Sequence, residues 1–184
     1  MKIQYGTSMC YPVSSMGSHV SVVPNHQLNR KTPLHTRANV AYFGTFGYEL
    51  DLNKLSDEEI SEVKQQITFM KEYRELIQFG TFYRLKSPFE GNETAWMTVS
   101  EDKKTALVFW YRERNVVNAD FTRVRLQGLD PDLIYRNEYN GTENYGDELM
   151  NLGLLTTDCT AGEPTSEDEP CTDYESRIYV LTAK

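Results

Sequence analysis

The residues best suited to acid–base chemistry are two carboxylates, Glu49 and Asp51, which lie two positions apart. If they end a strand, both side chains point to the same side, because side-chain direction alternates along a strand. A carboxylate pair in that arrangement could attack and protonate a glycosidic bond. The same spacing also occurs where a strand end leads into a capped helix. Both interpretations stay open from the residues alone.

The three histidines are the other candidates for a functional site. His19, His26 and His35 match no zinc-binding spacing, so no metal site is expected. His19 follows a strand-like run of serine, methionine and glycine, where it either lines a polar site or has a structural role. No phosphate-binding loop, nucleophile elbow or dinucleotide-binding glycine pattern occurs, and we expect no cofactor.

The cysteines do not form a recognisable framework. Cys10 stands between Met9 and Tyr11, and we expect it to pack as a small apolar side chain. Cys159 and Cys171 flank an acidic segment rich in glycine and proline. They could pair in an oxidising compartment, but three cysteines in all do not decide the matter.

Charge and hydropathy exclude several classes of partner. The 184 residues carry a net charge of -8, so we expect neither nucleic acid nor an anionic membrane surface as a partner. No apolar run approaches the roughly 20 residues that cross a bilayer. The first residues lack the apolar core of a signal peptide.

One long helix separates two styles of sequence. Ser56 and Glu59 form a capping box, and Asp57 and Glu58 add negative charge to the first helical turn. Apolar residues then recur every three or four positions as far as Ile77. This pattern predicts an amphipathic helix of about 24 residues at 1.5 Å per residue, ending near Gly80.

The two sides of this helix have different patterns. Before it, we expect a strand at 15–21, a helix at 34–41 and a strand at 43–50, which is α/β organisation. After Gly80 the sequence predicts only short strands with turns between them, which is typical of an antiparallel β-sandwich. The predicted strands are 81–85, 94–100, 105–112, 121–126, 133–139 and 177–181. We therefore expect one domain at 1–80 and a second at 81–184.

Several blocks of residues resemble the α-galactosidases of glycoside hydrolase family 36. The first half carries Ile3-Gln-Tyr-Gly-Thr-Ser8, Ser14-Ser-Met-Gly-Ser-His19 and Phe43-Gly-Thr-Phe-Gly-Tyr-Glu-Leu-Asp51. The second half carries Ala95-Trp-Met97, Gly128-Leu-Asp-Pro131 and Tyr145-Gly-Asp-Glu-Leu-Met150. The blocks follow the family's order and cover nearly the whole chain.

The resemblance implies the last two βα units of a (β/α)8 TIM barrel, followed by a C-terminal antiparallel β-sandwich. It also implies a retaining hydrolase of terminal α-D-galactose in galactosides and oligosaccharides. The family's nucleophile lies in a Lys-Trp-Asp block and its acid/base precedes the Ile-Gln-Tyr-Gly block. Neither is in this sequence, so no catalytic residue is assigned. We expect the isolated chain to be an inactive fragment.

Because the carboxyl ends of strands line barrel sites, His19 and Asp51 are the candidate substrate-binding residues. The resemblance further implies a cytoplasmic location and a homo-oligomer. The open edges of two barrel strands predict self-association through residues 1–80. The alternatives are a split gene whose partner supplies the rest of the barrel, and a non-catalytic structural or carbohydrate-binding β module. In the β-module alternative, Trp96 or Trp110 would respond to sugar.

Overall fold

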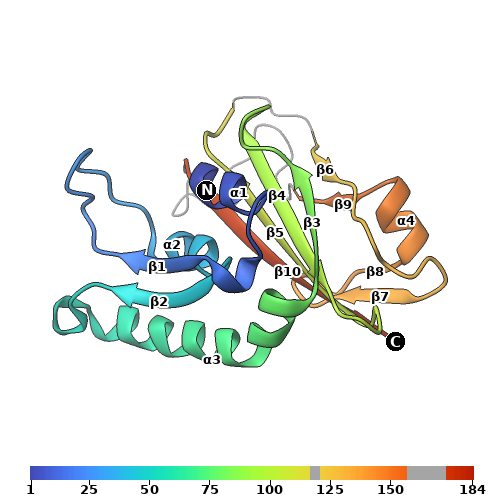
Figure 1. Ribbon diagram of the computed structural model, residues 1–184, viewed down its shortest axis with the longest axis horizontal. Coiled ribbons are helices and arrows are strands. Elements are labelled where there is room, and N and C mark those ends of the chain that lie inside the picture. The colour runs from blue at the N-terminus through green and yellow to red at the C-terminus, as the bar shows by residue number, and fades with distance from the viewer. Residues whose placement is uncertain (117–120, 157–172) are drawn as a thin grey trace. The chain divides into compact units, whose positions relative to one another are not determined.

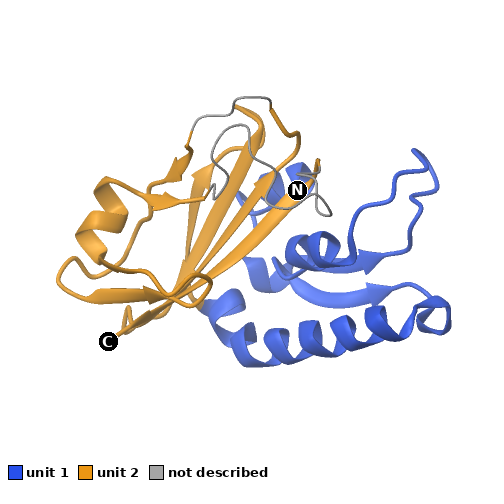
Figure 2. Ribbon diagram, turned by 180° about the vertical axis from the view of Figure 1, so that it is seen from behind, with its two compact units in different colours: residues 1–79 blue, residues 80–184 orange. Residues whose placement is uncertain are grey.

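The computed structural model describes residues 1–116, 121–156 and 173–184. The chain divides into two compact units, residues 1–79 and residues 80–184 (Figure 2). Cys159 and Cys171, and most of the acidic segment around them, lie outside the described residues. None of the described helices is long and apolar enough to cross a membrane.

The first unit alternates helices and strands (Figure 1). Its elements are α1 (Lys2–Thr7), η1 (Val13–Ser15), β1 (Gly17–Ser21), α2 (Leu34–Ala41), β2 (Thr45–Glu49), η2 (Leu52–Lys54) and α3 (Asp57–Phe79). The expected strand, helix, strand and long helix are confirmed. The sequence pattern did not predict α1, because a helix of six residues is too short to show a helical period.

The two strands of this unit run parallel and pair over five residues, from Gly17 opposite Thr45 to Ser21 opposite Glu49. Parallel neighbours need a crossover, which α2 and its flanking loops supply. Both strands therefore end at the same edge of the sheet. Each has a partner on one side only among the described residues.

Helices cover one face of this strand pair. Val20 is fully buried there, and Tyr48 hydrogen-bonds through its hydroxyl to Gln66 of α3. Tyr42 stacks on Phe46, with ring centroids 4.8 Å apart, and also contacts the ring of Phe69 in α3. Aromatic packing of this kind adds about 0.5–1.5 kcal/mol per pair beyond simple burial.

The predicted capping box at the start of α3 is confirmed. The backbone N–H of Glu59 donates to Ser56 Oγ at 3.2 Å, and the backbone N–H of Ser56 donates to Glu59 Oε2 at 3.0 Å. The helix runs for 23 residues and buries Val63, Met70 and Ile77. Its start is therefore determined by the few residues that cap it.

The second unit is built on an antiparallel sheet (Figure 1). Six strands follow the spatial order β3 (Thr81–Lys86), β4 (Glu93–Val99), β5 (Thr105–Arg112), β10 (Glu175–Ala183), β7 (Ile134–Asn137) and β8 (Glu143–Tyr145). Two short strands, β6 (Arg123–Val124) and β9 (Leu154–Leu155), pair separately. A short helix, α4 (Gly146–Asn151), precedes β9.

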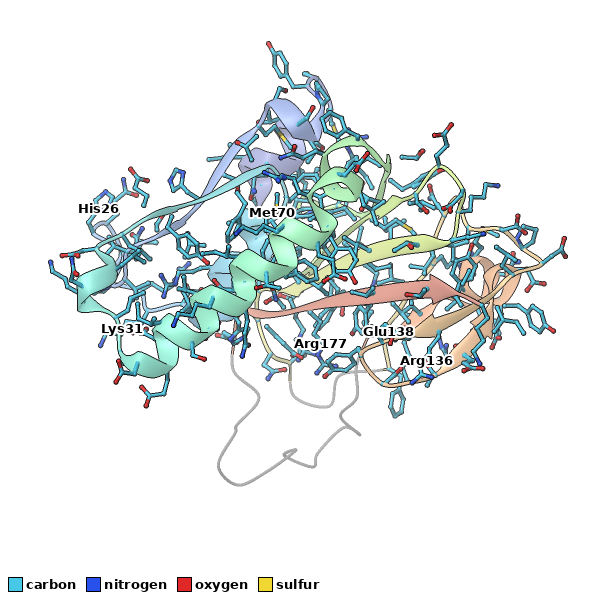
Figure 3. All side chains as sticks on the ribbon, turned by 90° about the horizontal axis from the view of Figure 1, so that it is seen from below. His26, Lys31, Met70, Arg136, Glu138 and Arg177 are labelled. Atoms are coloured by element: carbon cyan, nitrogen blue, oxygen red, sulfur yellow. The ribbon has the colours of Figure 1, made fainter. Side chains whose placement is uncertain are left out.

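Alternate residues of the central strands form the core of this unit. Met97, Val108 and Tyr179 are at most 1% exposed and belong to one cluster with Val124 and Leu149. On the same face, at the start of β10, the carboxylate of Glu175 forms ion pairs with both Arg112 and Arg177. Figure 3 labels Arg177, together with Arg136 of the neighbouring strand β7 and Glu138, which follows that strand. The antiparallel β organisation expected after Gly80 is confirmed.

Two details of the sequence prediction were wrong. A strand was expected at 121–126, but only Arg123 and Val124 of that segment pair as a strand, and Phe121 is 61% exposed. Cys10 is exposed rather than packed, because it lies in the turn that follows α1.

Candidate functional site

The candidate site lies at the carboxyl end of the β1–β2 pair. β1 carries His19, and β2 ends at Glu49. The parallel register places His19 opposite Gly47, and Glu49 follows two residues after Gly47 on the same strand. Both side chains therefore stand on the same face of the pair. This face lies opposite the one on which Val20 and Tyr48 point towards the helices.

The structure brings His19 and Glu49 together. His19 Nε2 lies 2.5 Å from Glu49 Oε2, and the two side chains remain 50% and 72% exposed. Among the described residues, no donor other than His19 reaches the Glu49 carboxylate. Its second oxygen, Oε1, is therefore available to a hydroxyl donor.

Asp51 has a different surrounding. It caps η2, and its Oδ1 accepts from the backbone N–H and the side-chain amide of Asn53 at 3.0 and 3.1 Å. Its other oxygen lies 3.9 Å from Lys54 Nζ. Asp51 therefore lies beyond the end of β2 and caps a short helix that the sequence pattern did not predict. Its role in substrate binding remains a hypothesis.

The rest of the exposed face consists of small side chains. Gly17 and Thr45 form its first level, His19 and Gly47 the second, and Ser21 and Glu49 the third. A Cβ atom added at Gly17 or at Gly47 would meet nothing within 4 Å. The face is therefore open, and its functional groups stand at the end where the strands finish. The alternation of Gly47 with Phe46 and Tyr48 is a sequence signal that could have indicated this face.

Arg37 of α2 fixes the loop that follows β1. Its guanidinium donates to the carbonyl of Ser21 at 2.6 Å and to the carbonyl of Thr32 at 3.0 Å. Burial lowers the Arg37 pKa from its usual value, while Glu59 and Glu62 of α3 oppose that shift. Sequence reasoning did not identify this residue, because its partners are carbonyls at both ends of a loop.

A second support lies behind the face. Gln4 of α1 directs its Nε2 at three acceptors: Ser18 Oγ at 2.9 Å, Val40 O at 2.9 Å and Phe43 O at 3.1 Å. These groups belong to β1 and to the end of α2. One side chain therefore joins three segments that are far apart in the sequence.

The other histidines stand apart from His19. His26 lies in the loop after β1. Figure 3 labels it, together with Met70 in the middle of α3. His35 lies in α2. Within the described ranges, no group of three or more His, Cys, Asp or Glu could hold a metal ion.

The tryptophans of the second unit do not form a sugar platform. Trp96 and Trp110 are both 0% exposed. A sugar ring stacks on an exposed aromatic face, so neither indole is accessible for that contact. Trp110 belongs instead to the buried core cluster of the second unit.

Comparison with known proteins connects both units to one enzyme family. A family described as Melibiase matches residues 1–80, and the glycosyl hydrolase family 36 C-terminal domain matches residues 93–181. The chain belongs to glycosyl hydrolase family 36. The two matches follow each other along the chain, in agreement with the resemblance of the residue blocks.

Relatives in family 36 extend far beyond this chain. It is 54% identical over 154 residues to α-galactosidase AgaA of Geobacillus stearothermophilus, covering 84% of this chain and 21% of the relative. It is 46% identical over 183 residues to α-galactosidase 1 of Pediococcus pentosaceus, covering 24% of that protein. A crystal structure of an AgaA variant in complex with raffinose matches 99% of this chain and 24% of its own, with 47% identity and a TM-score of 0.89. The chain thus spans less than a quarter of the length of these two curated relatives, and about a quarter of that solved chain.

Proposed function

We propose that this chain is the C-terminal part of an α-galactosidase that removes terminal α-D-galactose from galactosides and oligosaccharides with retention. The observation that carries the proposal is the β1–β2 pair, which helices cover on one face only. Its other face is open, small and polar, and ends in His19 and Glu49. In a (β/α)8 enzyme the inner face and the carboxyl ends of the strands hold the substrate.

In the complete enzyme, β1 and β2 are the last two strands of the barrel. The free edge of β2 supports this assignment, because a barrel strand needs a neighbour on each side. A groove of about 220 Å³ runs between β2 and α3. Its lining is apolar at Phe46, Ile67 and Met70 and cationic at Lys71 and Arg74. We propose that the preceding part of the barrel wall packs into this groove.

Residues 80–184 are the β-sandwich domain that follows the barrel. The six-stranded sheet and the β6–β9 pair supply its two layers, with the cluster around Val108 and Tyr179 between them. The alternative, a carbohydrate-binding module, is not favoured, because neither tryptophan is exposed. We retain a supporting role for this domain.

The isolated chain does not turn over substrate. Retaining hydrolysis needs two carboxyl groups about 5–5.5 Å apart, one attacking the anomeric carbon and one protonating the leaving oxygen. Asp51 is engaged in capping η2, and Glu49 is held by His19. The attacking and protonating groups therefore come from the part of the barrel that this sequence does not contain.

A chimeric enzyme tests this proposal. The corresponding segment of the Geobacillus relative is replaced by this chain, and hydrolysis of p-nitrophenyl α-galactoside is measured. We expect a soluble chimera with galactosidase activity within about tenfold of the parent, a loss of at most about 1.4 kcal/mol in transition-state binding. The 184-residue chain by itself is expected to give only background hydrolysis.

Two outcomes would contradict the proposal. One is a folded chimera, with the parent's circular dichroism spectrum and melting temperature, that lacks activity. The other is turnover by the isolated chain that exceeds buffer and that survives removal of contaminating galactosidase by a second purification. The parent enzyme with its own segment excised and rejoined is the matched control.

A further inference from the structure

The open face of β1 and β2 is unusual for the interior of a parallel barrel. Interior positions of (β/α)8 barrels are normally filled by branched apolar side chains, in layers. Here the six positions are two glycines, a serine, a threonine, a histidine and a glutamate. This sector therefore does not fill its own share of the interior, because two of the six positions carry no side chain.

The polar groups of this face are concentrated at the carboxyl end of the strands. Glu49 ends β2 opposite Ser21, the last residue of β1. His19 Nε2 reaches Glu49 Oε2 at 2.5 Å, which restricts the rotamers of an otherwise exposed carboxylate. One carboxylate oxygen is thus occupied by the imidazole, and no described residue hydrogen-bonds to the other. A fixed carboxylate with a free oxygen is a strong acceptor for a sugar hydroxyl.

Resting on the proposed function, we propose that Glu49 is a substrate-binding residue that accepts a hydrogen bond from a hydroxyl of the bound galactoside. His19 is its positioning residue, and Gly47 leaves room for the sugar ring beside them. The ligand class is a neutral pyranoside. Asp51, two residues farther on, is held by Asn53 and has no part in this contact.

The first experiment substitutes Glu49→Gln in the chimera described above. A hydrogen bond to a charged group contributes about 1.5–3 kcal/mol, so its loss raises KM by roughly 10- to 100-fold for every substrate that carries the contacted sugar. Glu72→Gln is the matched control, because it makes the same change at an exposed position of α3. It is expected to leave KM and kcat unchanged.

Two substrates locate the contact along the sugar chain. If Glu49 binds the terminal galactose, Glu49→Gln weakens binding of the aryl galactoside and of raffinose by the same factor. If it binds the next sugar, only raffinose is affected. Either result supports the proposal, whereas unchanged KM and kcat for both substrates would overturn it.

The second experiment tests His19 as a positioning residue. His19→Phe keeps a ring but removes the donor to Glu49, whereas His19→Gln restores a side-chain N–H of similar reach. We expect His19→Phe to raise KM by about tenfold, as for loss of one such contact, and His19→Gln to recover most of it. Equal effects of the two changes would overturn the positioning role, because a purely steric role makes no distinction between donors.

The third experiment fills the space beside the pair. Gly47→Leu adds a side chain into the open region, and we expect KM to rise at least about tenfold while the melting temperature falls by no more than a few degrees. Gly47→Ala, with a smaller addition, is expected to have an intermediate effect. If Gly47→Leu folds and binds substrate normally, the sugar does not occupy this space.

These results distinguish the inference from the proposed function. An inactive but folded parent chimera contradicts the proposed function itself, before any substitution is made. An active parent chimera in which Glu49→Gln changes neither KM nor kcat contradicts only the assignment of Glu49.

Discussion

At the scale of single residues, most of the side-chain hydrogen bonds that hold the first unit together are made by uncharged side chains. Gln4 and Tyr48 each link an outer helix to the strand pair, although neither belongs to a recognised motif. Polar groups that become buried without a partner cost about 1–3 kcal/mol. Such residues therefore stabilise the unit mainly by satisfying acceptors that would otherwise be unpaired.

Substitution of Gln4 by alanine tests this view. The change removes the donor shared by Ser18 Oγ, Val40 O and Phe43 O, and we expect a loss of about 1–3 kcal/mol in the free energy of unfolding. Urea denaturation followed by circular dichroism measures it. Gln65→Ala, at an exposed position of α3, is the control and should change stability by less than about 0.5 kcal/mol. Equal effects at the two sites would refute the role of Gln4.

The raised pKa of Tyr48 leads us to predict that the stability of the fold falls at alkaline pH. Burial, with a smaller contribution from Glu62, raises the pKa of Tyr48 from 10.0 to about 12. Because the folded pKa lies above the unfolded one, the contribution to stability is complete below about pH 10 and is lost as the pH rises towards about 12. We expect melting temperatures to fall across this window.

Two variants isolate the contribution of Tyr48. Tyr48→Phe cannot ionise, so its melting temperature should fall less steeply above about pH 10 than that of the wild type. Tyr11→Phe changes a ring that is 63% exposed and serves as the control. Parallel curves for wild type and Tyr48→Phe would show that Tyr48 does not titrate in this window.

At the scale of elements, α3 is the element whose local sequence is sufficient to define it. The capping box of Ser56 and Glu59 begins the helix, and the apolar stripe selects the face that packs. By contrast, β1 and β2 need each other and the two helices behind them. Parallel strands are stable only within such a layered arrangement.

Substitutions in the capping box measure the local contribution to α3. Ser56→Ala leaves the Glu59 N–H without its acceptor, and we expect a loss of about 1 kcal/mol in the free energy of unfolding. Ser61→Ala changes a solvent-exposed position within α3, away from the helix ends, and should be neutral or slightly stabilising. A double change at Ser56 and Glu59 that costs no more than either single change would show that the two hydrogen bonds act as one unit.

At the scale of the whole molecule, the first unit carries unpaired strand edges. β1 and β2 pair only with each other in the described part of the chain. An open edge of a parallel sheet offers backbone donors and acceptors to another chain. The isolated protein therefore has a route to association that the complete barrel would close.

Sedimentation velocity tests this expectation. We expect the 184-residue chain to form dimers or larger species as its concentration rises. Gly47→Lys places a charge on the open face, a device that discourages edge pairing, and should shift the distribution towards monomer. A wild-type chain that remains monomeric throughout the concentration series would contradict association through this unit.

Sequence alone was informative wherever the signal is local. The capping box, the apolar stripe of α3 and the change to short alternating strands after Gly80 predicted the long helix and both patterns of organisation. The helices α1 and α4 were missed because each has only six residues. β6 is also shorter than the strand expected at 121–126, because only Arg123 and Val124 have partners in β9, which lies about 30 residues farther along the chain.

The sequence by itself determined the family blocks, the order of β1, α2, β2 and α3, and the presence of His19, Glu49 and Asp51 near strand ends. Only the tertiary structure decided that His19 meets Glu49 while Asp51 caps η2. His19 and Glu49 lie 30 positions apart, and their contact depends on the parallel register and on the face that the helices cover. Those two features arise from packing between distant segments, which local spacing does not encode.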